Sequence, residues 1–226
     1  MKKILFHDLG LIGYQQAWDY QKEVHAKVLH HKVNAANGGR ENCLLFCEHP
    51  HVYTLGKSGS ESNLLIDSIQ LMAKDATFVK TDRGGDITYH GPGQIVGYPI
   101  LDLEWLGIGV KEYVSRIEET IIQTLKAYDL QSERLEGATG VWLEANTGKT
   151  RKICAIGVKV SRAITMHGFA FNINTDLGYF NYINPCGFTD KSVTSLEKEM
   201  GEKQDIAKVK TILKAKFEEV FDVRFI

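Results

Sequence analysis

The stretch TGVWLEANTGKTRKICAIGVKVSRAITMHGFAFNIN, residues 139–174, decides the fold. It holds three strand-like runs rich in apolar and β-branched residues: Thr139–Glu144, Arg151–Ser161 and Ile164–Asn174. Gly148 between the first two runs marks a hairpin turn. Strands that follow one another along the chain favour a mixed or antiparallel sheet over a doubly wound parallel one.

Helical patterns are few and widely spaced outside this stretch. Apolar residues at helical spacing predict three amphipathic helices, at Tyr14–Val33, Val110–Tyr128 and Asp205–Val220, with Asp205 as the N-cap of the last. Two further strand-like runs are Ile4–Phe6 and Asn42–Leu55, the second interrupted by Pro50. Together these patterns predict an α+β fold in which helices flank a mixed β-sheet.

The composition is that of an ordinary globular chain. Of its 226 residues, 43% are hydrophobic and 24% are charged, which excludes an intrinsically disordered protein. The formal net charge of −1 gives no global electrostatic case for nucleic-acid binding. No Pro/Ser-rich linker, repeat or low-complexity segment divides the chain, so we expect one domain over residues 1–226.

The four cysteines and the N-terminus predict the compartment. Cys43, Cys47, Cys154 and Cys186 are too few for a secreted disulfide scaffold of this length. The opening MKKILFHDLG lacks the apolar run of about 7–15 residues that a signal peptide needs. No run approaches the roughly 20 apolar residues of a membrane span. We therefore expect a cytoplasmic protein with reduced thiols.

The densest chemical segment is RGGDITYHGPGQ, Arg83–Gln94. Its four glycines allow a backbone to approach a ligand closely, and its polar residues can converge on what is held there. The segment lacks the Gly-Lys-Ser/Thr ending of a phosphate-binding P-loop, and its glycine spacing differs from a dinucleotide fingerprint. A glycine-rich hairpin with a surface histidine is the alternative interpretation.

Two cysteines compete as a nucleophile. Cys186 lies between Pro185 and Gly187, on a turn where a thiol can be reached. Cys154 lies in an apolar strand-like run, which is the setting of a structural thiol. Since a free thiol titrates near 8.5, a catalytic cysteine needs a neighbouring base or cation.

The candidates for that neighbour are basic side chains. Lys152 stands at the start of a strand, and lysine is the side chain whose pKa falls most readily on burial. A solvated surface role is its alternative. His167 lies in an apolar stretch and could equally be a hydrogen-bonded structural residue.

A metal site is a further alternative. Cys43, Cys47, His49 and His51 would share one face of a regular strand, and zinc accepts such ligands. Pro50 would distort that strand, and the spacing matches no common zinc-finger pattern. We therefore expect a core strand that runs into a loop, and no metal.

Taken together, these segments resemble the lipoate–protein ligase B family, the lipoyl(octanoyl) transferases. The run RGGDITYHGPGQIVGYP, Arg83–Pro99, is similar to the family's signature almost residue for residue. The stretch EHPHVYTLG (48–56) is similar to the family's upstream motif. Four further family-like motifs lie downstream, all in the family's order, so that the match extends from about Leu44 to Leu196: TGVW (139–142), RKICAIG (151–157), HGFA (167–170) and NPCG (184–187). His51 and Cys47 depart from the commonest family residues but lie outside the motifs that carry the chemistry.

The resemblance implies an acyltransferase on a fold like that of biotin protein ligases and lipoate ligases. Such an enzyme moves an octanoyl or lipoyl group from acyl carrier protein to a lysine of lipoyl domains or of the glycine-cleavage H protein, without a cofactor. It implies Cys186 as the acyl-thioester nucleophile and Lys152 as its partner. It also implies acyl-binding contacts at Arg83, Gly84, Gly85, Asp86, Ile87, Thr88, Tyr89, His90, Ala155, Ile156, Gly157, Gly168, Phe169 and Ala170.

The chemistry of the residues agrees with that resemblance. The donor is already a thioester, so exchange onto Cys186 needs no ATP, and covalent catalysis lets the two protein partners visit in turn. An ATP-dependent lipoate or biotin ligase would need no essential cysteine, and a non-catalytic binding module would be free to lose either Cys186 or Lys152. A monomer is the simplest expectation for the oligomeric state.

Overall fold

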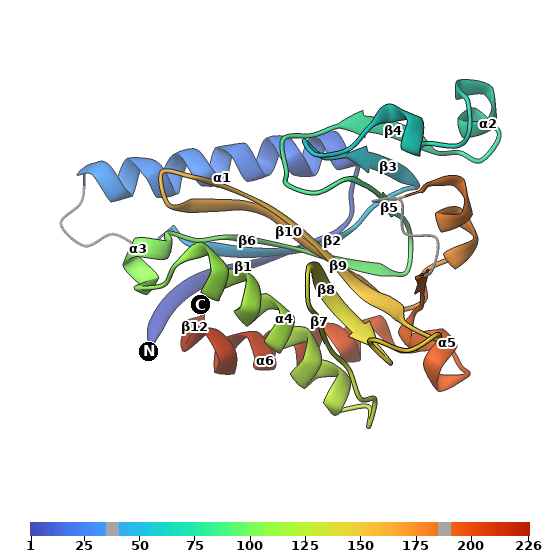
Figure 1. The fold of residues 1–226 in the computed structure, drawn as a ribbon. Helices are drawn as coiled ribbons and strands as arrows, with labels where there is room; N and C mark the ends of the chain where they lie inside the picture. The colour runs from blue at the N-terminus through green and yellow to red at the C-terminus, as the bar shows by residue number, and fades with distance from the viewer. Residues whose placement is uncertain (35–40, 185–190) are drawn as a thin grey trace.

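The computed structural model describes residues 1–34, 41–184 and 191–226. Figure 1 shows its elements along the chain. The strands are β1 (Lys2–Leu11), β2 (Cys43–Glu48), β3 (Val52–Leu55), β4 (Thr77–Lys80), β5 (Ile87–His90), β6 (Gln94–Ile100), β7 (Glu133–Leu135), β8 (Ala138–Leu143), β9 (Arg151–Ser161), β10 (Ile164–Asn172), β11 (Ser192–Val193) and β12 (Val223–Phe225). The helices are α1 (Tyr14–Asn34), α2 (Ser68–Met72), α3 (Leu103–Leu106), α4 (Val110–Lys126), α5 (Leu196–Met200), α6 (Ile206–Phe221) and two 3-10 helices, η1 (Glu61–Asn63) and η2 (Leu177–Tyr182).

A large mixed sheet forms the centre of the molecule. In the described part of the chain its strand order is β12-β1-β2-β6-β10-β9-β8-β7, and β11 pairs with β9 off this path. The pairs β2–β6, β6–β10, β10–β9 and β9–β8 are antiparallel, whereas β1 runs parallel to both β12 and β2. The prediction of an α+β fold with a mixed sheet is therefore confirmed.

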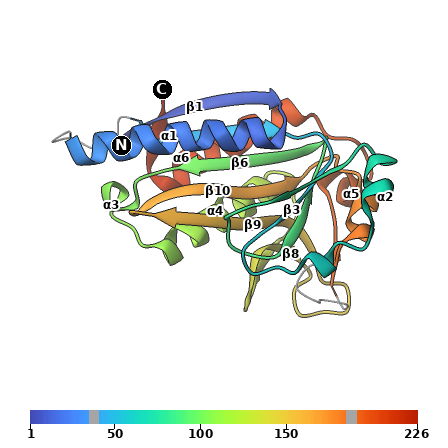
Figure 2. The ribbon, with the colours of Figure 1, turned by 90° about the horizontal axis from the view of Figure 1, so that it is seen from above.

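Helices cover both faces of this sheet. Figures 1 and 2 show α1 along one face and α4 and α6 along the other. On the α1 side, Val24 and Val28 pack with Leu45, Val96 and Ile100 of the sheet. The larger core lies on the other side, where α4 and α6 bury their apolar stripes against the sheet residues Leu44, Phe46, Ile95, Phe169 and Phe171. The strand alternation of β6 and β10 thus divides the apolar residues between two layers.

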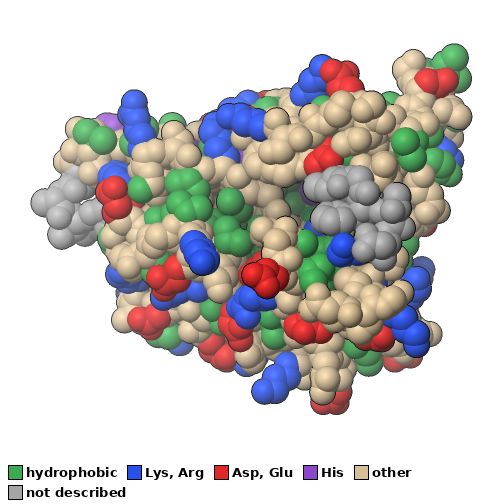
Figure 3. All heavy atoms as spheres, viewed as in Figure 1, with side chains coloured by type: hydrophobic (Ala, Val, Ile, Leu, Met, Phe, Trp, Pro, Cys, Tyr) green, Lys and Arg blue, Asp and Glu red, His purple; other side chains and the backbone are tan. Residues whose placement is uncertain are grey.

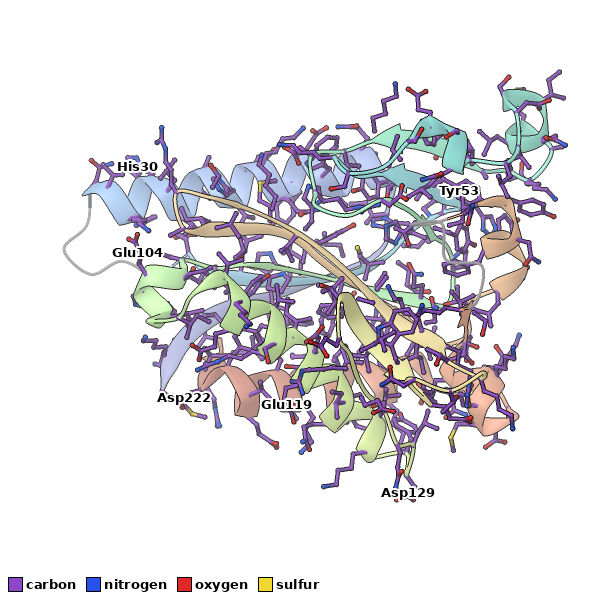
Figure 4. All side chains as sticks on the ribbon, viewed as in Figure 1. His30, Tyr53, Glu104, Glu119, Asp129 and Asp222 are labelled. Atoms are coloured by element: carbon purple, nitrogen blue, oxygen red, sulfur yellow. The ribbon has the colours of Figure 1, made fainter. Side chains whose placement is uncertain are left out.

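A second, small sheet lies beside the first. Its order is β4-β3-β5, with β3 parallel to β4 and antiparallel to β5. Tyr53, labelled in Figure 4, is buried here and donates a hydrogen bond of 2.9 Å to the carbonyl of Tyr179 in η2. The small sheet therefore ties the segment before β6 to the segment that leads to residue 184.

Most of the predicted elements are present. The three predicted helices correspond to α1, α4 and α6, and Asp205 caps α6 by accepting from the backbone N–H groups of Ala207 and Lys208. Strand β9 has the predicted bounds, β8 and β10 end within two residues of theirs, and Gly148 lies in the turn between β8 and β9. The run 42–55 is interrupted at Pro50, as expected. Strand β2 ends before Pro50 and belongs to the large sheet, and β3 begins after it and belongs to a different sheet.

That separation places His51 away from the other residues considered for a metal, whereas Cys47 Sγ still lies 3.5 Å from Nε2 of His49. His49 pairs with the Tyr98 hydroxyl at 2.8 Å, whereas His51 pairs with the Tyr89 hydroxyl at 2.7 Å in the small sheet. Among the described residues, no three His, Cys, Asp or Glu side chains gather as metal ligands.

The surface carries both charge signs, intermixed. Figure 3 shows Lys and Arg next to Asp and Glu over the face seen in Figure 1. No helix within the described ranges combines the length and the apolar character needed to cross a bilayer.

Candidate functional site

A cavity of about 590 Å³ lies where the Arg83–Thr88 segment meets strands β9 and β10. We call it the site cavity. The backbone N–H of Gly84 donates to the carbonyl of Val158 at 2.9 Å, which fastens the segment to the edge of β9. The side chains and backbone around it are those of Tyr14, Arg83, Gly84, Gly85, Asp86, Ile87, Thr88, His90, Gln94, Val96, Tyr98, Val114, Gly137, Ala138, Thr139, Lys152, Ala155, Ile156, Gly157, Val158, His167, Gly168, Phe169, Ala170, Asn172, Phe180 and Val193.

Small residues form one wall of the site cavity. Ala155 pairs with Ala170, and Gly157 pairs with Gly168, across the β9–β10 ladder. A Cβ at Gly157 would come within 2.9 Å of the Gly84 carbonyl oxygen, closer than real Cβ contacts. The short methyl side chains of Ala155 and Ala170 and the bare backbone of Gly157 therefore leave a largely apolar space beneath the glycine-rich segment.

Arg83 is a structural support of this segment. Its guanidinium is buried and donates to the carbonyl of Thr54 at 2.6 Å and to that of Asp86 at 2.7 Å. It also donates to the Thr54 hydroxyl at 3.0 Å. These bonds bend the segment around the guanidinium and connect it to β3.

His90 lies in a hydrogen-bonded chain along the wall. Its Nδ1 lies 2.8 Å from Oε1 of Gln94, and the Gln94 amide donates to Oδ1 of Asn172 at 2.9 Å. Because Gln94 uses its N–H groups elsewhere, Nδ1 carries the proton and donates it. The Thr54 hydroxyl lies 3.4 Å from Nε2 of the same ring.

The surroundings keep His90 neutral. Burial and the nearby His49 lower the pKa of His90 to about 3. Tyr14 stacks on its ring at a centroid distance of 5.9 Å. A histidine of this kind is a weak base at neutral pH and a fixed polar wall for whatever the cavity holds.

Lys152 borders the same space from the start of β9. Its ammonium donates to the Thr139 carbonyl at 3.2 Å and lies 4.4 Å from the ring centroid of Trp142. A Cβ at Gly140 would lie 3.3 Å from Lys152 Cε, so Gly140 leaves room for the aliphatic stem. The side chain is half-buried, which places an amine or ammonium at the edge of an apolar cavity.

The structure describes only one of the two candidate nucleophiles, Cys154. Cys154 is fully buried in the larger core, and burial raises the pKa of its thiol well above the ordinary range. It behaves as a small apolar residue, as the sequence indicates. Cys186 lies outside the described residues, which end at Asn184 and resume at Lys191.

His167 stands elsewhere along the cavity wall. It has a left-handed φ of 56°, and its Nε2 lies 2.8 Å from Oδ1 of Asp82. Lys159 binds the other oxygen of the same carboxylate at 2.5 Å. Asp82, directly before Arg83, therefore connects the glycine-rich segment to the β9–β10 hairpin.

The site cavity brings together nearly all of the residues that the sequence singled out. Arg83 through Thr88, His90, Lys152, Ala155 through Gly157 and Gly168 through Ala170 all line it. Tyr89 is the exception among the described residues. Strand alternation turns its ring into the small-sheet core, where it stacks on Tyr179 at 4.9 Å.

The structure adds lining residues that sequence reasoning missed. Tyr14 fits the apolar stripe of a helix, and its spacing holds no sign that it borders a cavity. Tyr98 and Asn172 fall within strands, and their positions in the sequence likewise do not show whether they pack in the core or border a cavity. Gln94 belongs to the glycine-rich motif, and its role emerges only from the bonds it makes to His90 and Asn172.

Comparison of the sequence with known proteins shows which family the chain matches. The family model described as the lipoyl protein ligase A/B catalytic domain matches residues 13–218. The octanoyltransferase of Parabacteroides distasonis is 56% identical over 223 residues, which are 98% of this chain and 100% of the relative.

Solved structures show the same fold at low identity. A bipartite lipoate protein ligase from Thermoplasma acidophilum superimposes with a TM-score of 0.74 at 13% identity, covering 100% of this chain and 86% of that one. The biotin protein ligase of Aquifex aeolicus in complex with biotin and ATP gives a TM-score of 0.52 at 10% identity, covering 98% and 71%. The expected resemblance to these two catalytic folds is confirmed. From the family model and the near full-length relative, this chain belongs to the lipoyl protein ligase A/B catalytic-domain family.

Proposed function

We propose that this chain is an octanoyltransferase that moves an octanoyl group from octanoyl-acyl carrier protein to a lysine of a lipoyl domain, through a thioester on Cys186. The observation that carries the proposal is the site cavity, an apolar space with small walls and with Lys152 at its edge. The name of the 56%-identical relative supports the same reaction.

The first half-reaction exchanges one thioester for another. The Cys186 thiolate attacks the octanoyl carbonyl, a bond forms from sulfur to the carbonyl carbon, and the carrier's thiolate leaves. The carrier thiolate then takes up a proton, which balances the proton lost by Cys186. Because both thioesters have similar free energy, the step needs no nucleotide.

The second half-reaction forms the amide. The neutral amine of the acceptor lysine attacks the acyl carbon, the Cys186 thiolate leaves, and the nitrogen passes one proton to the neutral amine of Lys152. Lys152 is the group that we assign to both proton transfers. As an ammonium it also stabilises the thiolate, in the way that a neighbouring cation lowers the pKa of a thiol.

The cavity walls provide the affinity for the acyl chain. Burial of an eight-carbon chain contributes roughly 0.8 kcal/mol per CH₂, which sums to several kcal/mol. His90 stays neutral and orients the polar end of the substrate, since its pKa of about 3 leaves it unprotonated at neutral pH. Arg83 holds the glycine-rich segment over the chain.

The partners follow from the reaction. We propose octanoyl-acyl carrier protein as donor, with lipoyl domains of 2-oxoacid dehydrogenases and the glycine-cleavage H protein as acceptors. We further propose that residues 1–226 act as one catalytic domain and that the chain works as a monomer.

The test is transfer without nucleotide. Purified protein is mixed with octanoyl-acyl carrier protein and an apo lipoyl domain, with and without ATP and Mg²⁺, and octanoylated lipoyl domain is measured by mass spectrometry. We expect equal rates in both mixtures. A protein that is inactive until ATP is added, and that then forms acyl-adenylate from free octanoate, would instead be an ATP-dependent ligase.

A further inference from the structure

The peptide group between Thr139 and Gly140, in strand β8, contacts a charged side chain on each of its polar sides. Its carbonyl, that of Thr139, accepts from the Lys152 ammonium at 3.2 Å. Its N–H, that of Gly140, donates to Oε1 of Glu118 at 3.0 Å. Since the two polar groups of a trans peptide point in opposite directions, this peptide lies between the amine of the site cavity and a carboxylate of α4.

Glu118 is a buried carboxylate with a partner for each oxygen. Its side chain lies between α4 and β8, two elements that pack side by side (Figure 1), and the residue is 8% exposed. The second oxygen, Oε2, accepts from Nε of Arg134 at 3.1 Å, and Arg134 also binds Glu119 at 2.8 Å. Because a buried charge is costly unless it is hydrogen-bonded, Glu118 holds the Gly140 N–H firmly.

The orientation of this peptide requires glycine. Gly140 has a φ of 129°, which L side chains rarely adopt, and a Cβ there would lie 2.6 Å from the carbonyl oxygen of Cys154. Glycine alone therefore allows the chain to aim its N–H at α4 and the preceding carbonyl at Lys152.

A bulge in β9 directs the Lys152 side chain to the same place. Two consecutive residues of β8 pair with Cys154 and Lys152, which leaves Ile153 as the extra residue of the bulge. In a regular strand Lys152 and Ala155, three positions apart, would point to opposite faces of the sheet. With the bulge, both line the site cavity. The direction of the Lys152 side chain is thus set by the pairing with β8, the strand that Glu118 holds.

We propose that Glu118 is a positioning residue that fixes the Lys152 ammonium at the edge of the site cavity through the Thr139–Gly140 peptide. The inference rests on the proposed function, in which Lys152 serves the Cys186 thiol. A carboxylate that accepts from the peptide N–H polarises the peptide and increases the negative charge on its carbonyl oxygen. The Thr139 carbonyl then binds the ammonium more strongly, and Lys152 is oriented before the acyl donor arrives.

The experiment measures kcat, KM for octanoyl-acyl carrier protein and the pH profile of Cys186 alkylation by iodoacetamide. Glu118→Ala frees the Gly140 N–H. We expect kcat to fall about tenfold and KM to stay within about a factor of two, because the cavity walls are unchanged. The apparent pKa of the Cys186 thiol should rise, in the direction expected for Lys152→Ala.

Two variants control for a general loss of structure. Glu118→Gln keeps an oxygen that accepts from the Gly140 N–H, and it should restore most of kcat. Glu119, labelled in Figure 4, binds the same Arg134 from the next position of α4. Glu119→Ala should therefore keep the wild-type kcat, KM and thiol pKa.

A double variant tests whether Glu118 acts through Lys152. In the Lys152→Ala background, Glu118→Ala should change neither kcat nor the thiol pKa further. Losses of equal size with and without Lys152, or wild-type kinetics and thiol pKa in Glu118→Ala, overturn the inference and leave the proposed function standing. If Glu118→Ala does not fold, Glu118→Asp, whose carboxylate is one methylene shorter, replaces it with the same expectations. A wild-type protein that transfers no acyl group overturns the proposed function and the inference with it.

Discussion

At the scale of single residues, we propose different roles for Lys152 and His90 in the reaction. Free histidine has the pKa of a biological base, so from the sequence alone His90 competes with Lys152 for the role of the group that accepts the thiol proton. The structure places it in a chain with Gln94 and Asn172 and lowers its pKa to about 3. We therefore propose Lys152, half-buried at the edge of the cavity, as the partner of the Cys186 thiol.

This division predicts different effects of two substitutions on Cys186. Lys152→Ala removes a cation that favours the thiolate, so the apparent pKa of the thiol rises and turnover falls by on the order of 10² or more. His90→Ala leaves the thiol pKa nearly unchanged and weakens acyl transfer. The measurement is the pH profile of Cys186 alkylation by iodoacetamide. A shift that appears in His90→Ala and is missing in Lys152→Ala would exchange the two roles.

The sequence motifs named many of the residues that line the site cavity, and strand geometry explains why Tyr89 does not line it. The residues of the motif Arg83–His90 are neighbours in sequence, but successive side chains of a strand point to opposite faces of the sheet. Hence Thr88 and His90 border the cavity whereas Tyr89 enters the small-sheet core. Tyr14 was missed because helical periodicity marks a buried face without telling a packed core from a cavity wall.

At the scale of elements, the approach of the glycine-rich segment to β9 requires glycine. A Cβ at Gly157 would meet the Gly84 carbonyl oxygen at 2.9 Å and Arg83 Cδ at 3.3 Å. Gly157→Ala should displace the segment and lower kcat/KM for octanoyl-acyl carrier protein on the order of tenfold or more, because small misplacements of binding groups are costly.

The matched control for that prediction is Gly148→Ala. Gly148 lies in the β8–β9 turn, and a Cβ there meets nothing within 4 Å. We expect its kinetics to equal those of the wild type. Equal kinetics for Gly157→Ala as well would show that the contact between the segment and β9 is unimportant for the reaction.

The strands also show which pairings sequence patterns predict and which they do not. Strands β8, β9 and β10 follow one another and were predicted closely, because each is long and pairs with its neighbour in sequence. The small sheet was not predicted. Its strands have four residues each, and β3 pairs with β4 and β5 across intervals that include α2 and the glycine-rich segment, so local patterns carry little of the pairing.

At the scale of the whole molecule, buried neutral histidines couple stability to pH. Burial lowers the pKa of His49 to about 4 and that of His90 to about 3, from 6.5. Between these values and 6.5 the unfolded chain binds protons that the folded chain does not. The free energy of unfolding therefore falls as the pH drops below about 6.5.

The expected size of this effect is about 3 kcal/mol between pH 7.5 and pH 5.5, about 1.4 kcal/mol for each histidine. Urea unfolding at the two pH values measures it, and His49→Gln should reduce the difference by about 1.4 kcal/mol. The control is His30, which is exposed near the C-terminal end of α1 and is labelled in Figure 4. His30→Ala should leave the difference in the free energy of unfolding between the two pH values unchanged. A free energy of unfolding that is the same at both pH values would contradict neutral buried histidines.

The central claim is the covalent intermediate on Cys186, and mass spectrometry tests it most directly. The protein is mixed with octanoyl-acyl carrier protein alone, without ATP and without acceptor, and its peptides are mapped. We predict one octanoyl group on Cys186, released by hydroxylamine, and none on the Cys186→Ala variant, which should also be inactive. An octanoyl group found only on Cys154, or full turnover by Cys186→Ala, would contradict the account.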